Sequence, residues 1–356
     1  MKRLVRAMIY ECVKCRKLRG KAGTQIMSEL PEDRVSPGPP FTSVGVDVFG
    51  PWNIVARRTR GGTSNTKRWA VLYTCLTTRA IHIEVIEELS TSSFINATRR
   101  FIAIRGPVRL FRSDKGTNFV GATDCMKIDA INVEDGPVRQ LLNDNRTCWI
   151  FNSPHSSHMG GVWERLIGVV RRILESMFVD VRGDITHEVL TTFMAEVCLI
   201  VNSRPLVPVS TDPENPTVLN PTMLLTQKPC EEGQYLDEIS LKDMYKAQWR
   251  RVQCLSDMFW KRWKIEYIQT LQQRKKWSTS QRDFKVGDVV LVIEDNCHRN
   301  NWPMGIITEL YPSKDGHVRK VMVKLNRTGE SESKSYVRPI TKIVQLIEHE
   351  DKCIGL

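Results

Sequence analysis

Two aspartates and one glutamate of this chain are of the type and placement that could bind a divalent cation. Asp47 interrupts the alternating apolar run in GVDVFGP, where a buried carboxylate is costly without a cation or strong hydrogen bonds. Asp114 ends a second short strand in RSDKGTNF, and Glu164 follows the loop SPHSSHMGG. Converging carboxylates repel one another, and Mg²⁺ or Mn²⁺ relieves that repulsion. Two such ions about 4 Å apart can drive an in-line phosphate displacement. For any one of the three residues taken alone, a turn or cap carboxylate is the preferred explanation.

The segment that carries Glu164 has the period of a helix. Apolar residues between Val162 and Leu174 form a broad stripe, and Glu164, Gly168, Arg171 and Glu175 fall on the opposite face. The Gly160-Gly161 pair has the composition of a loop, so we expect Glu164 in the first helical turn, pointing away from the core. A solvated acid near a helix N-terminus is the alternative reading.

The elements upstream alternate between strands and helices. Apolar alternation predicts a strand over 43–49 that ends at Gly50-Pro51, and a strand pair around Thr77 to Arg79. A helix is expected over 90–105, between capping residues and Gly106-Pro107. Further strands are expected near 108–113 and 147–152, with helices at 137–142 and 186–202. This order predicts an α/β class in which helices cover a sheet.

The second half of the chain is predicted to contain a proline-rich segment, then a helix, then a set of short strands. Six prolines between 203 and 229 predict a covering arm or linker without packed elements. Residues 239–277 read as a basic helix with an aromatic stripe, which is either a packing seam or a track for phosphates, with slight preference for the track. From 283 on, short strands separated by turn residues predict a small β-barrel. The expected domains are therefore 1–30, 31–202, 203–237, 238–282 and 283–347.

The net charge and the cysteine content indicate the kind of partner and the cellular compartment. A formal charge of +12 on 356 residues suggests a polyanion such as nucleic acid. Ten irregularly spaced cysteines and the lack of a signal peptide predict an intracellular protein, and no apolar run is long enough to span a membrane. Cys12 and Cys15 have the spacing of half a zinc site, but residues 1–30 hold no second Cys or His pair with matching spacing, so two free cysteines are the preferred reading.

Three motifs together carry a family resemblance. GVDVFGP, RSDKGTNFVGA and PHSSHMGGVWERLIGVVRRIL resemble the catalytic core of retroelement integrases. The Trp-Glu-Arg version, with 50 positions between Asp114 and Glu164, is most similar to integrases of Pao/BEL-type long-terminal-repeat retrotransposons. Retroviral integrases have a shorter interval. VNSRPLVPVS, FWKRWKIEYIQTLQQRKKW and DFKVGDVVLV extend the resemblance over nearly the whole chain.

The resemblance implies a ribonuclease-H-like core in which Asp47, Asp114 and Glu164 are catalytic and bind two Mg²⁺ or Mn²⁺ ions. It implies trimming of element DNA ends and joining of the new 3′ hydroxyl to target DNA, in the nucleus, by a homo-multimer. Cys12 and Cys15 match the second half of the family's His-His-Cys-Cys zinc module, and the two histidines of that module are missing. The chain is therefore expected to be truncated at its N-terminus, and zinc is not expected to bind to this fragment. Weaker candidates for DNA contact, each explained as well by turn or surface chemistry, are Lys115, Asn118, Arg165, Arg171 and Arg172.

Two other functions stay open on the sequence alone. One is a DNA-binding protein that no longer catalyses, either an inactive remnant or a domesticated derivative of an integrase. The other is a related nuclease that hydrolyses DNA without joining it, because hydrolysis and strand transfer use the same metal site. The intact set of three carboxylates favours catalysis.

Overall fold

The computed structural model of the chain describes residues 2–14, 30–59, 62–114, 136–152, 157–180, 185–208, 218–228, 247–271, 282–294, 297–325 and 334–347. The chain forms two compact units, Met1–Val35 and Ser36–Leu356. The first contains helix α1 (Lys2–Glu11) and the single turn α3 (Glu32–Val35). Cys12 follows α1 and donates its N–H to the carbonyl of Met8 at 3.0 Å, while Cys15 lies outside the described residues.

A five-stranded mixed sheet forms the centre of the second unit, with strand order β3-β2-β1-β4-β5. Its strands are β1 (Ser43–Thr59), β2 (Gly62–Cys75), β3 (Ile81–Ile86), β4 (Leu110–Ser113) and β5 (Cys148–Phe151). The first three pair antiparallel as a meander, and β4 and β5 add parallel to β1. The strand pair predicted on either side of Thr77 to Arg79 corresponds to β2 and β3.

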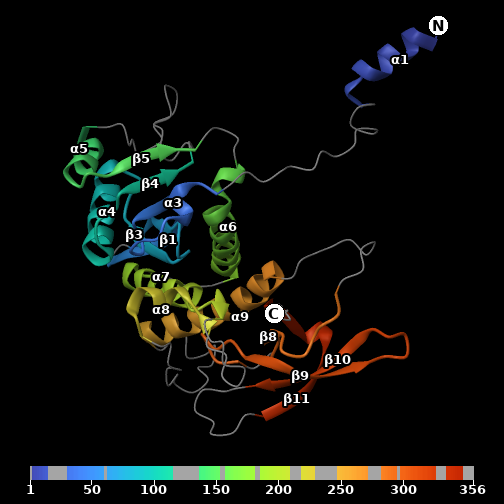
Figure 1. Ribbon diagram of the computed structural model, residues 1–356. Coiled ribbons are helices and arrows are strands. Elements are labelled where there is room, and N and C mark those ends of the chain that lie inside the picture. The colour runs from blue at the N-terminus through green and yellow to red at the C-terminus, as the bar shows by residue number, and fades with distance from the viewer. Residues whose placement is uncertain are drawn as a thin grey trace. The chain divides into compact units, whose positions relative to one another are not determined.

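Helices cover both faces of this sheet (Figure 1). One face packs against α4 (Thr91–Arg105) and α5 (Gly136–Asp144), and the other against α6 (Ser157–Asp180) and α7 (His187–Asn202). A mixed five-stranded sheet in this order between two helical layers is the ribonuclease-H-like core, so the predicted fold class is confirmed.

The alternation in β1 decides which face each side chain meets. Val44, Val46 and Val48 are buried in the core with α4 and α5. Because side chains alternate along a strand, Asp47 lies on the opposite face, the one that α6 covers. The spacing of the valines in the sequence is in accord with this orientation.

Two predicted element boundaries are wrong. Strand β1 does not end at Gly50-Pro51 but continues to Thr59, with a shift of register between Phe49 and Trp52. The shift accommodates Gly50, whose φ of 116° suits glycine, and a proline that cannot donate to the ladder. Helix α6 begins at Ser157, so Gly160-Gly161 lie inside it and Glu164 is the eighth helical residue, not a first-turn residue.

The segment after α7 is also more ordered than predicted. Strands β6 (Val207–Pro208) and β7 (Val218–Leu219) form a two-stranded ladder, and helix α8 (Pro221–Thr226) follows. The Asn220 side chain caps α8 by accepting from the Met223 N–H at 2.8 Å. The prolines therefore delimit short elements, and the expectation of an arm without packed elements is wrong for this part.

Helix α9 (Gln248–Leu271) carries the aromatic stripe, which is buried. Phe259, Trp263 and Tyr267 stack along one face and belong to the same core as α6 and α7. The stripe is thus a packing seam, and the alternative of a track for phosphates does not apply to these rings. Trp249 is the exception, because half of its surface is exposed.

The C-terminal strands form a separate antiparallel sheet of order β11-β10-β9-β8-β12. Its members are β8 (Val289–Val292), β9 (Met304–Pro312), β10 (Val318–Leu325), β11 (Lys334–Pro339) and β12 (Ile343–Ile347). A 3-10 turn, η2 (Ile340–Lys342), leads into β12, which returns to pair with the first strand. Val290, Ile307, Val321 and Val323 are fully buried in its own small core. Among the described helices of the whole chain, none combines the length and apolarity needed to cross a bilayer.

Candidate metal centre

Asp47 and Asp114 stand level with each other on neighbouring strands. In the parallel β1–β4 ladder, Ser43, Val44 and Gly45 pair with Leu110, Phe111 and Arg112. Extending this register by two residues brings Asp47 opposite Asp114. Neighbouring strands lie about 4.8 Å apart, and paired residues present their side chains on the same face. The two carboxylates, 67 positions apart in sequence, therefore project from adjacent strands on the face that α6 covers.

Helix α6 supplies a counter-charge to this pair. Nη2 of Arg171 lies 3.1 Å from Oδ2 of Asp47 and also donates to the carbonyl of Val48 at 3.2 Å. The other carboxylate oxygen, Oδ1, accepts the Val48 N–H at 2.9 Å. The ion pair is partly solvated, with 40% of the Arg171 side chain and 30% of the Asp47 side chain exposed. It fixes the packing of α6 over the strand that carries Asp47.

The surroundings of Asp47 disfavour its ionised form on balance. Burial raises the pKa of the carboxyl, and the negative charge of Asp114 raises it further, whereas Arg171 and the Val48 N–H lower it; the net pKa is above the usual value for aspartate. Arg171 and the Val48 N–H therefore do not offset the cost of burying this carboxylate. A bound divalent cation would supply the missing positive charge.

We expect Asp47→Asn to raise the melting temperature of the cation-free protein at neutral pH. Because the Asp47 pKa is higher in the folded than in the unfolded chain, ionisation lowers the free energy of unfolding as the pH rises from about 4 through the folded pKa. Asparagine does not ionise, so the free energy of unfolding of the variant does not fall in this way. Its advantage should be present at pH 7 and shrink toward pH 4, which thermal unfolding of both proteins in EDTA across this range would measure. A wild-type protein at least as stable as the variant at pH 7 would contradict the expectation.

Asp114 is held by an amide that sequence analysis missed. Nδ2 of Asn152 donates to Oδ1 of Asp114 at 2.8 Å. The β4–β5 ladder pairs Ser113 with Phe151, so Asn152 is level with Asp114 just as Asp114 is level with Asp47. The Asn152 side chain is only 3% exposed, and its Oδ1 has no hydrogen-bond partner among the described residues. The signal in the sequence was a lone amide directly after the strand CWIF, which turn chemistry also explains.

Of the other predicted site residues, the structure describes the side chain of Arg172 and the backbone of Glu164 and Arg165. The backbone of Glu164 and Arg165 is helical within α6, but their side chains lie outside the described residues, as do Lys115 and Asn118 entirely. Arg172 is exposed, and its Nε is 3.5 Å from the carbonyl of Gly168 in its own helix. Within the described part of the chain, no group of three or more His, Cys, Asp or Glu residues could hold a metal ion.

The groups that are described fit a hard divalent cation. Two carboxylates stand side by side, a buried amide oxygen without a partner among the described residues lies beside them, and α6 covers the same face. Carboxylate and amide oxygens are the ligands that Mg²⁺ and Mn²⁺ prefer. Arg171 also lines a hollow of about 360 Å³ between β1 and α6, whose other walls include Trp52 and Phe178.

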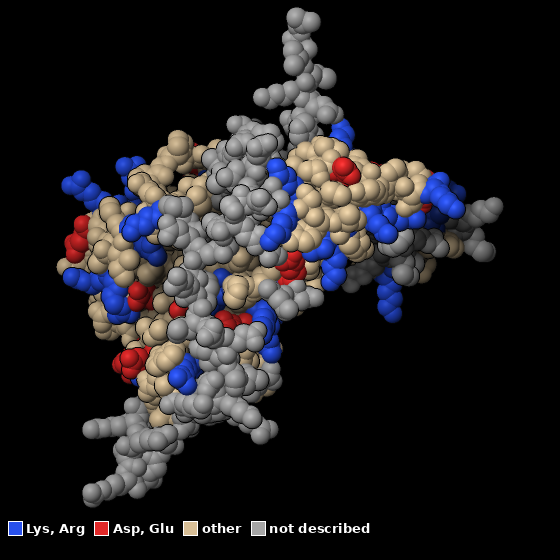
Figure 2. All heavy atoms as spheres, turned by 90° about the horizontal axis from the view of Figure 1, so that it is seen from below, with Lys and Arg blue, Asp and Glu red and all other residues tan. Residues whose placement is uncertain are grey.

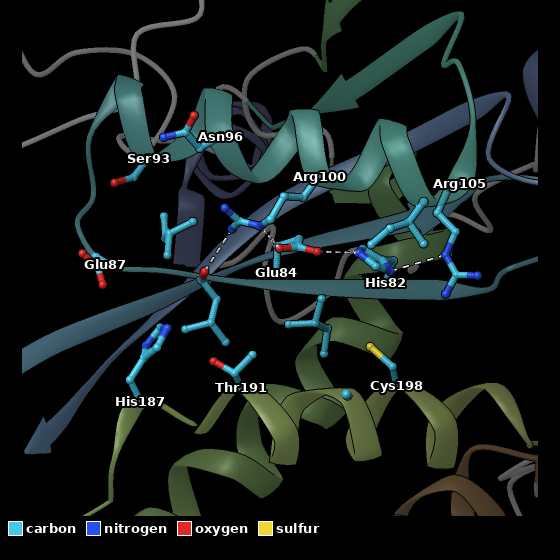
Figure 3. Close-up of a pocket in the computed structure, with 15 residues that line it drawn as sticks. His82, Glu84, Glu87, Ser93, Asn96, Arg100, Arg105, His187, Thr191 and Cys198 are labelled. Atoms are coloured by element: carbon cyan, nitrogen blue, oxygen red, sulfur yellow. Dashed lines mark hydrogen bonds and ion pairs between the residues drawn. The ribbon is translucent and has the colours of Figure 1, made fainter. Parts of the chain in front are cut away.

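A second hollow, of about 610 Å³, lies elsewhere on the sheet, between β3, α4 and α7 (Figure 3). Glu84 occupies its floor, 2.6 Å from Nε of Arg100 and 2.9 Å from Nε2 of His82. Burial raises the pKa of Glu84, but the hydrogen bonds from His82 and Arg100 outweigh it and hold the pKa below its usual value. Neither Asp47 nor Asp114 lines this hollow, and its charged groups largely satisfy one another.

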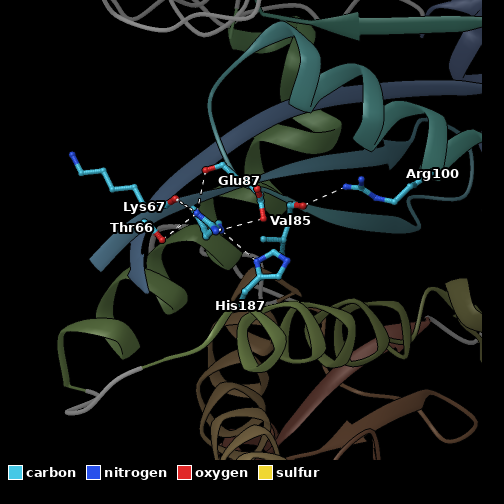
Figure 4. Close-up of polar contacts among 7 residues, drawn as sticks. Thr66, Lys67, Val85, Glu87, Arg100 and His187 are labelled. Atoms are coloured by element: carbon cyan, nitrogen blue, oxygen red, sulfur yellow. Dashed lines mark hydrogen bonds and ion pairs between the residues drawn. The ribbon is translucent and has the colours of Figure 1, made fainter. Parts of the chain in front are cut away.

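At one edge of this hollow, Arg68 joins β2 to the start of α7 (Figure 4). Its guanidinium lies 3.5 Å from Glu87 Oε1, 3.4 Å from His187 Nδ1 and 3.2 Å from Thr66 Oγ1. Burial, together with the positive charge of Arg68, lowers the pKa of His187. His187 is therefore neutral near pH 7 and can accept from Arg68, which gives this cluster a structural role.

Comparisons with known proteins bear on different parts of the chain. A model described as a family of unknown function (DUF5641) matches residues 247–346, which include α9 and most of the C-terminal sheet. No curated protein sequence matches the chain.

Solved structures are similar in fold at low sequence identity. A chain of the simian T-cell lymphotropic virus intasome, in complex with PP2A regulatory subunit B56 gamma, is 10% identical with a TM-score of 0.37 over 98% of this chain and 92% of that chain. The HTLV-2 integrase catalytic core domain, solved with magnesium in a dimeric form, is 12% identical with a TM-score of 0.31 over 46% of this chain and 88% of that chain.

Proposed function

We propose that this chain is a retrotransposon integrase of the Pao/BEL type, which trims the ends of element DNA and joins them to target DNA by metal-dependent phosphoryl transfer. The observation that carries the proposal is the placement of Asp47 and Asp114 in one row of the sheet, beneath the helix that bears Glu164. Both proposed reactions displace one phosphodiester oxygen by another, so they need cations and positioning but no protein nucleophile.

Asp47, Asp114 and Glu164 are the proposed ligands of two Mg²⁺ or Mn²⁺ ions. When bound, these ions would promote ionisation of the attacking water or 3′ hydroxyl and stabilise the charge that develops on the leaving oxygen. Burial, and to a smaller extent the neighbouring Asp114, raises the pKa of Asp47, and a bound cation would favour the ionised form of both carboxylates, which otherwise carry unbalanced negative charge. Arg171 balances part of it, and a phosphate of the DNA would be an alternative partner for its guanidinium.

DNA is the proposed partner on the grounds of charge. Lysine and arginine side chains outnumber acidic ones on the face of the described residues shown in Figure 2. We assign phosphate contacts to Lys115, Asn118, Arg165, Arg171 and Arg172 around the carboxylates, and further DNA contacts to the C-terminal sheet. Residues 1–30 are proposed as part of a zinc module, with Cys12 and Cys15 as two of its ligands. Assembly as a homo-multimer on paired DNA ends in the nucleus completes the proposal.

A branched duplex that represents the joined product tests this function without knowledge of the element's end sequence. Because phosphoryl transfer is reversible, an integrase should resolve the branch by transferring the phosphodiester to a 3′ hydroxyl, which yields a longer labelled strand. We expect this product with Mn²⁺ or Mg²⁺ and none with EDTA. Shorter hydrolysis products alone would identify a nuclease, and salt-sensitive DNA binding without turnover would identify a non-catalytic DNA-binding protein.

A further inference from the structure

We infer that Asn152 is a positioning residue that holds Asp114 in the orientation required for cation binding; this inference rests on the function proposed above. It concerns a residue that none of the sequence motifs singled out. The geometry that carries it is a row of three polar side chains, Asp47, Asp114 and Asn152, at one level of three adjacent parallel strands.

The contact between Asn152 and Asp114 is directional. A carboxylate accepts through two oxygens, and the Asn152 amide donates to one of them, Oδ1, at 2.8 Å. This leaves Oδ2 of Asp114 free of that bond and fixes the rotation of the carboxylate about its terminal torsion, which is otherwise soft. Asp114 is exposed, so without Asn152 its carboxylate would sample several orientations.

Asn152 is itself well placed to act as a fixed support. Its backbone N–H donates to the carbonyl of Ser113 at 2.9 Å, which continues the β4–β5 ladder up to the level of Asp114. Its side chain is buried, so it has little freedom to move away. Groups that hydrogen-bond to a ligating carboxylate fix its orientation, and their loss commonly weakens metal affinity by about 10- to 100-fold.

The unpartnered Oδ1 of Asn152 is the second, independent observation. A buried amide oxygen without a hydrogen bond is costly, and no described residue satisfies this one. Beside a cation site, water in the hydration shell of the ion supplies the donor that such an oxygen needs. One amide group can thus support both the carboxylate and the hydration shell, whereas a purely structural asparagine would be satisfied by the protein itself.

The test is Mn²⁺ binding to the full chain, measured by electron paramagnetic resonance and by calorimetry, for the wild type and a set of variants. Asn152→Leu keeps the size of the side chain and removes the donor, and Asn152→Ala serves if the leucine variant does not fold. Asn145→Ala is the matched control, because the Asn145 amide donates at the same distance of 2.8 Å to a backbone carbonyl, that of Leu141. Asp47→Asn and Asp114→Asn report on the cation site itself, and thermal unfolding shows that each variant is folded.

We expect Asn152→Leu to weaken Mn²⁺ binding by about tenfold or more, with Asn145→Ala unchanged and both aspartate variants showing a larger loss. In the branched-DNA assay, excess Mn²⁺ should restore the Asn152→Leu rate but not the Asp114→Asn rate. Normal Mn²⁺ affinity in Asn152→Leu, together with loss in both aspartate variants, would overturn the role of Asn152 and leave the proposed function intact. Unchanged binding in the aspartate variants would overturn the cation site and the inference with it.

Discussion

Asp114→Asn and Glu164→Gln are each expected to lower the rate of metal-dependent strand transfer by about three orders of magnitude or more. Both substitutions keep the shape of the side chain and remove its negative charge. Two divalent cations carry four positive charges, and three carboxylates with the DNA phosphates balance them; the loss of one carboxylate removes a ligand and upsets that balance. Loss of a residue that acts as part of a unit costs nearly as much as loss of the unit.

Glu188→Gln provides the matched control for charge removal. Glu188 is exposed in the first turn of α7, and its backbone carbonyl accepts from the Thr192 hydroxyl. The same change of a carboxylate to an amide should leave the transfer rate within about twofold of the wild type, because exposed charges away from the site contribute little. DNA binding measured at several salt concentrations would separate loss of chemistry from loss of affinity. Near wild-type transfer by either site variant would show that its carboxylate is not a catalytic ligand.

The second large effect is on stability. Trp263→Ala is expected to lower the free energy of unfolding by about 3–5 kcal/mol, the usual cost of removing a large aromatic side chain from a core. The Trp263 ring has no exposed surface and stacks between Phe259 and Tyr267 in the core that α9 shares with α6 and α7. The substitution would therefore loosen α9 from the helix that carries Glu164 and Arg171.

Trp249→Ala is the control for that prediction on the same helix. Half of the Trp249 surface is exposed (51%), and its ring contacts Arg250 next to it in sequence. We expect a change of about 1 kcal/mol or less for this variant, as for exposed cation–π contacts. Urea unfolding of the three proteins would give the comparison. Equal destabilisation by both substitutions would mean that the aromatic seam of α9 is not the packing element described here.

Much of the core could be predicted because its determinants are local. The valines at 44, 46 and 48 alternate, which places Asp47 on the opposite face whatever the rest of the chain does. Helices α4 and α7 begin at residues with capping side chains, Ser90 and Thr186, and Gly106 ends α4. Patterns of this kind depend on neighbours within one turn or one strand, so the sequence alone is enough to predict the helices that they delimit.

The remaining features depend on tertiary contacts. The ion pair between Asp47 and Arg171 joins residues 124 positions apart, so nothing in either segment indicates it. Asn152 acquires its significance only from the register of β4 against β5, which sequence periodicity does not fix. The continuation of β1 beyond Gly50-Pro51 depends on its ladder with β2, which compensates for two residues that usually end a strand.

The most direct test of the central claim is the location of Mn²⁺ in crystals of the protein, determined from its anomalous scattering. The account predicts Mn²⁺ peaks bounded by the carboxylates of Asp47, Asp114 and Glu164, with Asn152 beside Asp114, and their disappearance in Asp114→Asn crystals. Mn²⁺ bound elsewhere in the chain, or at this place without a contact from Glu164, would contradict it.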